Sequence, residues 1–244
     1  PLRSAIYAFK ADFVVAAWIA RLKPAELPAA QRALADESYA NPVIRDFDEK
    51  PLDIRTVDRP INVLMDLEPR NSETVALAGR VLDSHSIVGP TLARALAEGK
   101  PVASAPVPLL SKSGQIGIVL VAPVSQDGAE PVGFVSFSYE IGPLLLANDD
   151  RSLFSVVLRN PQEPGSELTA SEQGAVTVRP IAEASPAPSI LRTVGFGGRD
   201  WSLAYYAKHD PSQRAQQTAV IVAAIGLAIT GIICGLFGYV AYNN

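Results

Sequence analysis

The side chains that could support a reaction are gathered in one run, Asp83-Ser84-His85-Ser86. Aspartate, histidine and serine are the components of acyl transfer, in which the histidine takes the hydroxyl proton and the carboxylate orients the imidazole. Neighbours in the chain cannot reach that geometry, because nucleophile, base and orienting group come from separate segments. The sequence therefore favours His85 as a surface or capping residue, and a hydrolase acting from this turn is a minor hypothesis.

Other patterns typical of catalysis or metal binding do not occur in the sequence. His85 and His209 are the two histidines and Cys234 is the single cysteine, so no histidine set or cysteine cluster for a metal can be assembled. There is no Walker loop, Rossmann glycine pattern or Gly-x-Ser-x-Gly elbow. A net charge of −4 with mixed signs gives no basis for nucleic-acid binding. We expect a protein that is not an enzyme and needs no cofactor or metal.

Residues 83–86 lie inside the longer stretch 70–110, which is predicted to form an exposed loop, a turn, a short helix and a strand. Gly89-Pro90 opens the helix, and Gly99 ends it, because glycine readily adopts the left-handed conformation at a helix C-terminus. A strand is expected over residues 101–106. A turn and helix that run back along a sheet often form the wall of a small-molecule pocket, and we assign that role to this stretch.

Two clear strands follow the wall, at residues 116–123 and 132–139. The Asp-Gly pair between them predicts a hairpin, since glycine accepts the positive φ that the turn requires. In the second strand Ser136 and Ser138 alternate with bulky residues, so we expect the bulky face to be core. The serine face is expected either to border a cavity or to form an exposed sheet face.

The N-terminal region is predicted to be helical. Apolar residues recur at helical spacing over residues 4–22, which indicates an amphipathic helix, and an alanine-rich helix follows over residues 24–38. Both are expected to act as a packed stalk or scaffold. Strands are then predicted at residues 43–47 and 61–67.

A second β-rich region begins after residue 150. Its connecting loops are rich in Pro, Gly and Ser, as expected for surface turns, and a tight turn is predicted at residues 197–200. Helical segments are too few for an α/β sheet, so the fold class is α+β with two antiparallel sheets in tandem. The predicted strands of this region are residues 153–158, 175–179, 189–196 and 201–207.

Residues 218–240 are predicted to form one C-terminal transmembrane helix. These 23 residues carry no charge, and at about 1.5 Å rise per residue they span a hydrocarbon core of roughly 30 Å. Small residues alternate in steps of four and three along one side, where close packing would favour a homodimer or contact with another transmembrane subunit. The other interpretation is that the span merely tolerates them. The residues of this helix-packing seam are Ala224, Ala228, Gly231, Gly235 and Gly238.

Short motifs in a fixed order over about residues 13–146 resemble the CHASE domain, the extracytoplasmic sensory module of membrane histidine kinases and nucleotide cyclases, including the plant cytokinin receptors. A membrane span after the motifs fits the same resemblance. The motifs are Trp18-Ile19-Ala20-Arg21-Leu22, Leu67-Glu68-Pro69, Asn71, Ala78-Gly79, Leu82, Ser84, Arg94-Ala95-Leu96, Gly99-Lys100-Pro101-Val102, Gly117-Ile118-Val119-Leu120, Pro123-Val124 and Gly133-Phe134-Val135.

The resemblance implies a long N-terminal stalk helix and two PAS-like domains, of which the membrane-distal one holds the ligand. It also implies a periplasmic main domain anchored in the inner membrane. Lys208 and Arg214 precede the span, and their charge alone would place the domain in the cytoplasm; the resemblance outweighs that count. The implied divisions are 1–39 (N-terminal helices), 40–147 (membrane-distal domain), 148–212 (membrane-proximal region) and 218–240 (transmembrane helix).

The resemblance also implies where a ligand would bind. The aspartate that bonds the adenine ring in cytokinin-binding relatives falls on Val81, which cannot form that hydrogen bond, so cytokinin recognition by that chemistry is not expected. Arg80 is a candidate contact for an anionic ligand or a solvated side chain, and Asp83 is a ligand contact or a helix cap. The ligand-binding positions implied by the resemblance are Val81, Ala103, Ser104, Val121 and Ser136.

The expected function is that of a small-ligand sensor module in a membrane signalling receptor. Its ligand is a small molecule of unknown identity, and the transmembrane helix would relay ligand binding to an output domain outside this chain. The alternative is a non-catalytic accessory subunit of a membrane complex, which keeps a CHASE-like fold for anchoring or assembly. A coiled coil and a catalytic domain after residue 244 would favour the sensor, and a stop codon would favour the subunit.

Overall fold

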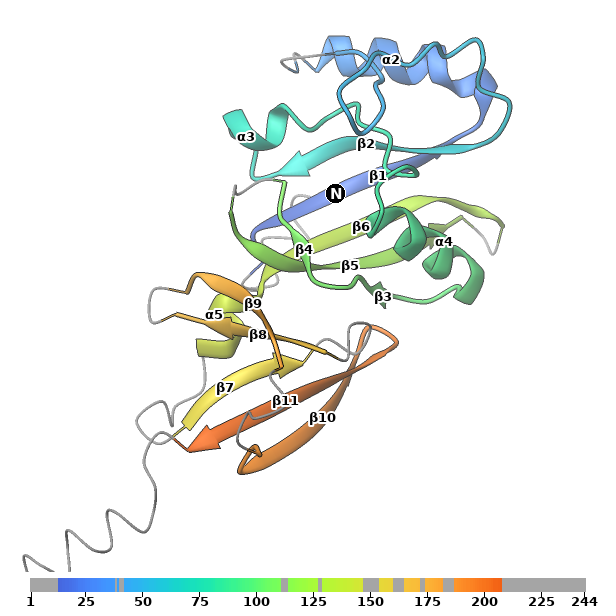
Figure 1. The fold of residues 1–244 in the computed structure, drawn as a ribbon. Coiled ribbons are helices and arrows are strands. Elements are labelled where there is room, and N and C mark those ends of the chain that lie inside the picture. Colours follow the sequence, from blue (N-terminus) through green and yellow to red (C-terminus); the bar gives the residue numbers. More distant parts are fainter. Residues whose placement is uncertain are drawn as a thin grey trace, which may run out of the picture.

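The computed structural model describes residues 13–37, 39, 42–110, 114–126, 129–146, 154–159, 165–171, 174–181 and 187–207. Within these ranges two antiparallel sheets follow each other along the chain, with a few short helices packed around them (Figure 1). The α+β class and the two tandem sheets predicted from the sequence are therefore confirmed.

The first sheet has the strand order β2-β1-β6-β5-β3, and β4 pairs with β5 beside β3. Among the described residues, a 3₁₀ turn and four helices accompany the two sheets: η1 (Pro24–Glu26), α2 (Leu27–Asp36), α3 (Ser72–Val75), α4 (Val88–Glu98) and α5 (Ile141–Leu146). The strands of the first sheet are β1 (Val15–Leu22), β2 (Ile61–Glu68), β3 (Val102–Ala103), β4 (Val107–Pro108), β5 (Ile116–Ser125) and β6 (Pro131–Glu140).

Strand β1 corrects the prediction of a helix over residues 4–22. Residues 15–22 pair antiparallel with both β2 and β6 and lie inside the sheet, and the earlier part of the predicted helix lies outside the described residues. Five of the first six residues of β1 are buried, so both faces are covered. A strand covered on both faces has a continuous apolar run instead of alternation, and short runs of this kind also fit helical spacing.

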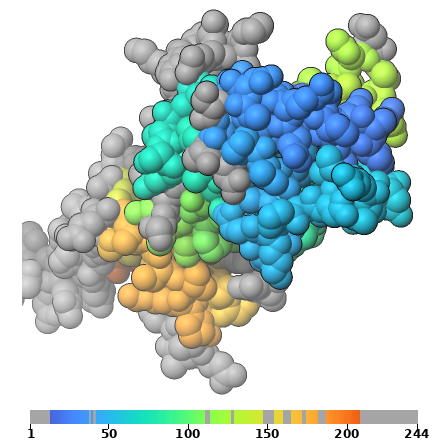
Figure 2. Space-filling model, turned by 90° about the horizontal axis from the view of Figure 1, so that it is seen from above, coloured from blue at the N-terminus to red at the C-terminus, as the bar shows by residue number. Residues whose placement is uncertain are grey.

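The predicted alanine-rich helix is confirmed as η1 and α2, and the strand at 61–67 is confirmed as β2. The segment at 43–47 forms isolated bridges through Arg45 instead of a strand. Seen from above, α2 and residues 42–60, in blue to cyan, cover one side of the molecule (Figure 2). Helix α4 ends at Gly99, whose φ of 63° is the expected left-handed cap.

The hairpin of β5 and β6 agrees with the predicted strands, but its faces are reversed. Phe134 and Ser136 are buried at 0% and 5% exposure, whereas Val135 and Phe137 on the other face are only half-buried. The serine face therefore points into the interior, where residues of the 70–110 segment cover it. Alternation identified two faces but not which one the rest of the chain covers.

The second sheet has the order β10-β11-β7-β8-β9. All four predicted strands are confirmed, and the hairpin turn uses Gly197 and Gly198 at φ values of 58° and 67°. Strand β8 and helix α5 were not predicted. Helix α5 packs against this sheet, and Leu158, Leu168 and Trp201 lie in the small core between them. The strands are β7 (Phe154–Arg159), β8 (Ser166–Ala170), β9 (Val176–Pro180), β10 (Ile190–Phe196) and β11 (Arg199–Ala207).

The predicted transmembrane helix at residues 218–240 and its seam (Ala224, Ala228, Gly231, Gly235 and Gly238) lie outside the described residues. In the part of the chain that the structure describes, no helix is both long enough and apolar enough to cross a membrane.

Candidate functional site

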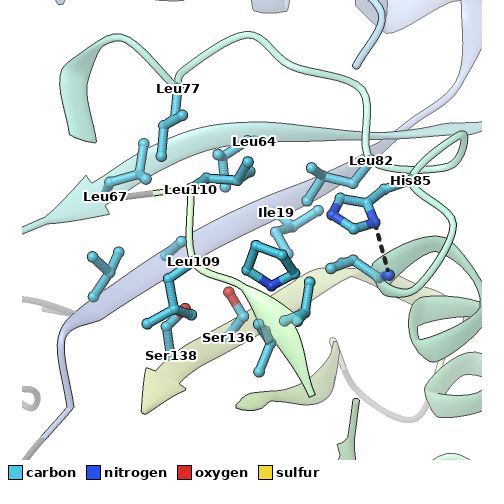
Figure 3. A pocket seen from close by; sticks show the side chains of 16 residues that line it. Ile19, Leu64, Leu67, Leu77, Leu82, His85, Leu109, Leu110, Ser136 and Ser138 are labelled. Atoms are coloured by element: carbon cyan, nitrogen blue, oxygen red, sulfur yellow. Dashed lines mark hydrogen bonds between the residues drawn. The ribbon is translucent and has the colours of Figure 1, made fainter. Parts of the chain in front are cut away.

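A pocket of about 70 Å³ lies on the inner face of the first sheet. Its floor is formed by side chains of β1, β2, β5 and β6, including Ala17 and Ile19. Its wall is formed by residues 77–88 and by residues 107–110, which pass over the strands (Figure 3). Because a single water needs about 10–15 Å³, the pocket has room for a ligand of several non-hydrogen atoms. The predicted wall and the predicted serine face therefore meet at a cavity.

Three polar side chains, His85, Ser136 and Ser138, interrupt an otherwise apolar lining. Among the described residues, none forms a hydrogen bond with the hydroxyl of either serine, and neither oxygen is sealed away from the cavity. Figure 3 shows His85 on the wall side and both serines on the strand side. The cavity thus offers hydrogen-bonding groups from two opposite directions.

The imidazole of His85 is fixed by the chain around it. Its Nδ1 accepts hydrogen bonds from the backbone N–H groups of Ile87 and Val88, at 3.1 and 3.3 Å, and so caps the start of α4. The ring also packs edge-on against Phe47, with 4.3 Å between centroids. Burial lowers the pKa of His85 below its usual value, so at neutral pH the ring is uncharged and carries its proton on Nε2. The predicted capping role is confirmed, but the residue is buried and not on the surface.

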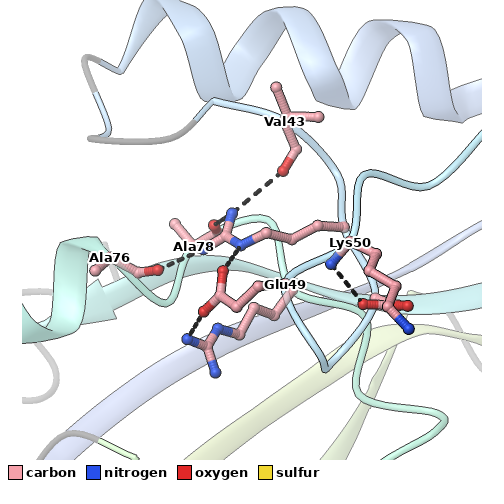
Figure 4. Close-up of polar contacts among 8 residues, drawn as sticks. Val43, Glu49, Lys50, Ala76 and Ala78 are labelled. Carbon is pink, nitrogen blue, oxygen red and sulfur yellow. Dashed lines mark hydrogen bonds and ion pairs between the residues drawn. The ribbon is translucent and has the colours of Figure 1, made fainter.

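The wall is held in place by Arg45, which is 1% exposed. Its guanidinium donates to the carbonyl oxygens of Ala76 and Ala78 and forms an ion pair with Glu49 at 2.7 Å (Figure 4). The backbone of Arg45 also pairs with both ends of the turn at 79–81. A loop far away in the sequence therefore fixes the position of residues 76–81.

Gly79 makes this approach possible. It has a φ of 87°, and a Cβ atom built on it would lie 2.6 Å from the carbonyl oxygen of Val43. Any larger residue would therefore push the loop away from the wall.

Asp83 stabilises the turn that carries His85. Its carboxylate accepts from the backbone N–H of Asn62 at 2.7 Å and from the side-chain amide of Asn62 at 2.8 Å. It neither caps α4 nor lines the pocket. Gly89 packs on this turn, where a Cβ atom would lie 2.4 Å from the carbonyl oxygen of Asp83. Asp83 therefore has a structural role in this arrangement.

The nucleophile–base–orienter arrangement of a hydrolase is not formed by residues 83–86. The carboxylate of Asp83 binds Asn62, and Ser84 and Ser86 are exposed and do not line the pocket with His85. The geometry gives no support to acyl transfer from this turn.

The five positions implied by the family resemblance are only partly brought together. Ser136 lines the pocket, whereas Val81 and Val121 are core residues at 7% and 0% exposure. Ser104 is fully buried, and its hydroxyl donates to the carbonyl of Ala105 and accepts from the N–H of Val119. Both polar backbone groups of Ala103 bind other parts of the chain. The roles of these residues in ligand binding stay predictions.

Arg80 lies beside the wall and not in the pocket lining. Its guanidinium forms an ion pair with Glu49 and lies over the ring of Phe47, 5.8 Å from the centroid. The charge is thus already partnered within the protein, which gives no support to the idea of an anionic ligand at this position.

Ala103 lies at a junction between the two sheets. Its N–H donates to the carbonyl oxygen of Gly197, in the β10–β11 hairpin, at 2.7 Å. Its carbonyl accepts from Arg199 at 2.7 Å and from Arg94, on α4, at 3.1 Å. Arg94 also donates to the carbonyl of Gly197 at 3.2 Å. The hairpin of the second sheet is thereby attached to β3 and α4 of the first, as Figure 1 shows.

His85 lines the pocket, and the sequence did not predict that position for it. Its ring packs against Phe47, which lies 38 positions earlier in the chain. No local sequence pattern links two residues so far apart. Leu109 and Leu110 lie within the predicted wall of residues 70–110 and line the pocket, although they follow a strand predicted to end at residue 106.

The fold and the pocket together define a class of protein. Two antiparallel sheets in tandem, the first enclosing a small cavity, are the arrangement that the resemblance to a sensory domain implied. The family model for the CHASE domain matches residues 11–168. The chain therefore belongs to the CHASE domain family.

A search of the curated proteins finds no match to the chain. Among solved structures, it is similar to the ligand-binding domain of the Pseudomonas aeruginosa PAO1 amino acid chemoreceptor PctC in complex with GABA. The identity is 12% over 81% of this chain and 75% of that chain, with a TM-score of 0.43. The corresponding domain of PctB in complex with L-Arg, from the same organism, is 10% identical over 85% of this chain and 79% of that chain, with a TM-score of 0.41.

Proposed function

We propose that the chain is the small-ligand sensor module of a membrane signalling receptor, and that its ligand binds in the pocket between the first sheet and the 77–110 wall. The observation that carries the proposal is the pair of hydroxyls, Ser136 and Ser138, which open onto an apolar cavity and have no hydrogen-bond partner among the described residues. A hydroxyl in such a place is costly unless a ligand or water binds it. Ligand binding explains an apolar pocket lined by such hydroxyl groups better than packing does.

The junction at Ala103 supports a route for the signal. Helix α4 supplies both Val88 to the pocket wall and Arg94 to the carbonyl of Gly197. A ligand that prefers one position of α4 therefore also biases the position of the β10–β11 hairpin. Such a shift can be no larger than the difference in the ligand's affinity for the two positions.

The second sheet leads toward the membrane. Strand β11 ends at Ala207, and the predicted span begins at residue 218. We propose that this span carries the change in the second sheet across the inner membrane, and that a homodimer or another transmembrane subunit packs on its small-residue seam. The main domain would then be periplasmic, as in CHASE domains.

The test is a thermal-shift screen of the full chain in lipid nanodiscs against a library of small metabolites. A ligand present at 100 times its Kd stabilises the folded state by about 2.7 kcal/mol, which is readily seen as a higher unfolding temperature. Ala17→Leu fills the pocket floor and should abolish this shift. The matched control is Ala122→Leu, on β5 of the same sheet and outside the pocket lining, where the shift should persist.

A screen in which no compound stabilises the wild-type chain would contradict the sensor function. That result would favour the accessory subunit, which needs the fold but no ligand. A compound that shifts wild type and Ala17→Leu equally would show that binding occurs away from this pocket.

A further inference from the structure

We propose that the ligand is an uncharged molecule with a compact hydrocarbon body and a carbonyl group that accepts a hydrogen bond from Nε2 of His85. Small ketones, esters and lactones are of this class. The inference rests on the proposed function, because it assigns a chemistry to the same pocket. It adds which ligand atom is recognised and which side chain recognises it.

The lining argues against a charged ligand. The described residues that line the pocket are aliphatic side chains, Pro108, His85 and two serines, and none carries a formal charge at neutral pH. An ammonium or carboxylate group that leaves water for such a cavity loses its hydration without gaining an ion pair. A neutral ligand avoids this cost, and its hydrocarbon part gains from contact with residues such as Ile19 and Leu64.

His85 acts as a donor of fixed direction. Because two backbone N–H groups point at its Nδ1, that nitrogen must keep its lone pair, and the hydrogen is confined to Nε2. No described residue accepts a hydrogen bond from Nε2. In Figure 3 the bonded nitrogen faces the start of α4, and the other faces the side of Ile19 and the cavity. A ligand atom opposite it must therefore be an acceptor.

The two serines complete the site without narrowing its chemistry. They lie two residues apart on one face of β6, so their Cα atoms are about 7 Å from each other. A hydroxyl can rotate to donate or to accept, so Ser136 and Ser138 fit either kind of polar group at the far end of a ligand. His85 cannot adapt in this way, and for that reason it selects the ligand.

The chain offers a direct readout, since it has only two histidines. In nitrogen-15 NMR spectra of the full chain in nanodiscs with labelled histidine, His85→Asn identifies the signals of His85. The probe is cyclopentanone, a neutral acceptor. Cyclopentylamine and cyclopentanecarboxylate have the same ring with a positive and a negative charge, and cyclopentane has the ring without an acceptor.

The expected result is that cyclopentanone shifts the Nε2–H signal of His85 and leaves Nδ1 bonded, whereas the two charged analogues do not. Cyclopentane should bind several-fold more weakly than the ketone, since it cannot accept the hydrogen bond. His85→Asn keeps an oxygen that can accept the N–H groups at the start of α4 but loses the donor, and should weaken ketone binding roughly fivefold. The matched control, His209→Asn, should leave the affinity unchanged.

Two results would overturn this inference and leave the sensor function intact. One is a stabilising library compound that is charged, or tighter binding of the amine or the carboxylate than of the ketone. The other is a neutral ligand whose affinity is the same in wild type and His85→Asn. If cyclopentanone leaves the His85 signals unchanged and the library screen also yields no ligand, both the inference and the sensor function are wrong.

Discussion

The first and second sheets differ in how completely their faces are covered. Strand β1 of the first sheet is buried along most of its length, and the core around it is continuous with the pocket. In the second sheet every residue of β10 is exposed, and Leu191 is 54% and Val194 45% exposed. A selective pocket needs walls that exclude water, and within the described residues the first sheet provides them.

The two sheets also use their polar side chains differently. In the second sheet the indole N–H of Trp201 donates to the carbonyl of Phe196 at 3.1 Å, and the hydroxyl of Tyr206 accepts from Arg159 at 2.9 Å. In the first sheet Ser136 and Ser138 point into the pocket without a described partner. Polar groups in the second sheet stabilise the fold, whereas those of the pocket are available to a ligand. This difference fits the division that we propose, with binding in the first sheet and transmission through the second.

The largest expected effect is that of Arg45→Leu, which should destabilise the first sheet and not the second. The change removes the donors to Ala76 and Ala78 and leaves both carbonyls in the wall without their partner. We expect a loss of about 3 kcal/mol in the free energy of unfolding, because two carbonyls lose hydrogen bonds from a charged donor. Arg59→Leu, at an exposed position, should have little effect.

The two tryptophans separate the sheets in this measurement, because Trp18 lies on β1 and Trp201 on β11. In denaturant titrations, the fluorescence of Trp18 (in a Trp201→Phe background) should report the loss. The fluorescence of Trp201 (in a Trp18→Phe background) should change much less. An equal loss at both tryptophans would show that the sheets unfold as one unit and would contradict the division.

Gly197→Val should have the next largest effect, at the junction of the sheets. A Cβ atom on Gly197 would lie 2.3 Å from the Cβ of Ala103, and the φ of 58° is unfavourable for valine. We expect a cost of roughly 2 kcal/mol and a wider separation between the unfolding midpoints of Trp18 and Trp201 than in the wild-type chain. Gly195→Val is the control on the same hairpin, since its Cβ would meet only Asp200 at 3.6 Å. Coincident transitions in Gly197→Val would remove the junction from the signalling route.

The parts of the fold that could be predicted from the sequence are those whose causes are local. Gly99 ends α4 because glycine adopts the left-handed cap, and the hairpins follow from turn glycines between apolar runs. The serine face of β6 was recognised as one side of a possible cavity for the same reason, since alternation is a local pattern.

The predictions that were wrong concern elements whose structure depends on contacts between distant residues. Strand β1 was mistaken for a helix, because its place inside the sheet depends on pairing with β2 and β6, which are distant in the sequence. The N–H of Ala103 binds Gly197 in the hairpin of the second sheet, and no local pattern predicts that contact. Helix α5 was missed although Pro143 falls in its first turn, a favoured position.

The candidate site shows the same limit. Ser136 was predicted and lines the pocket, while the position of His85 depends on Phe47 and on the wall that Arg45 holds. Val81 was placed by comparison with relatives that have an aspartate there, and in this chain it packs in the core. Pocket residues on a wall that is held by a distant loop cannot be read from local spacing.

The pH dependence of stability should also differ between the two sheets, by less than the effects of Arg45→Leu and Gly197→Val. Burial lowers the pKa of His85 in the folded protein below its ordinary value of 6.5. As the pH falls through about 6.5 the unfolded chain takes up a proton that the folded chain does not, so stability is present above this pH and is lost below it. Denaturant titrations from about pH 7.5 to 5.5 should show this loss at Trp18 more than at Trp201.

The control for the pH experiment is again the second histidine. His85→Asn should flatten the pH dependence seen at Trp18, and His209→Asn should leave it unchanged. No salt bridge among the described residues involves His85, so moderate salt should not alter the result. An unaltered pH dependence in His85→Asn would mean that other groups cause it.

The smallest expected effect is that of Ser136→Ala, and it distinguishes a binding hydroxyl from a structural one. Ser136 and Ser104 are both buried in the first sheet, at 5% and 0% exposure. Ser104→Ala breaks two hydrogen bonds, at 2.7 and 2.9 Å, and should cost about 1–2 kcal/mol. Ser136→Ala breaks none and should leave the free energy of unfolding within about 0.5 kcal/mol of wild type, measured at Trp18. If both substitutions cost the same, the Ser136 hydroxyl supports the fold, and the strand side of the pocket loses its role in ligand binding.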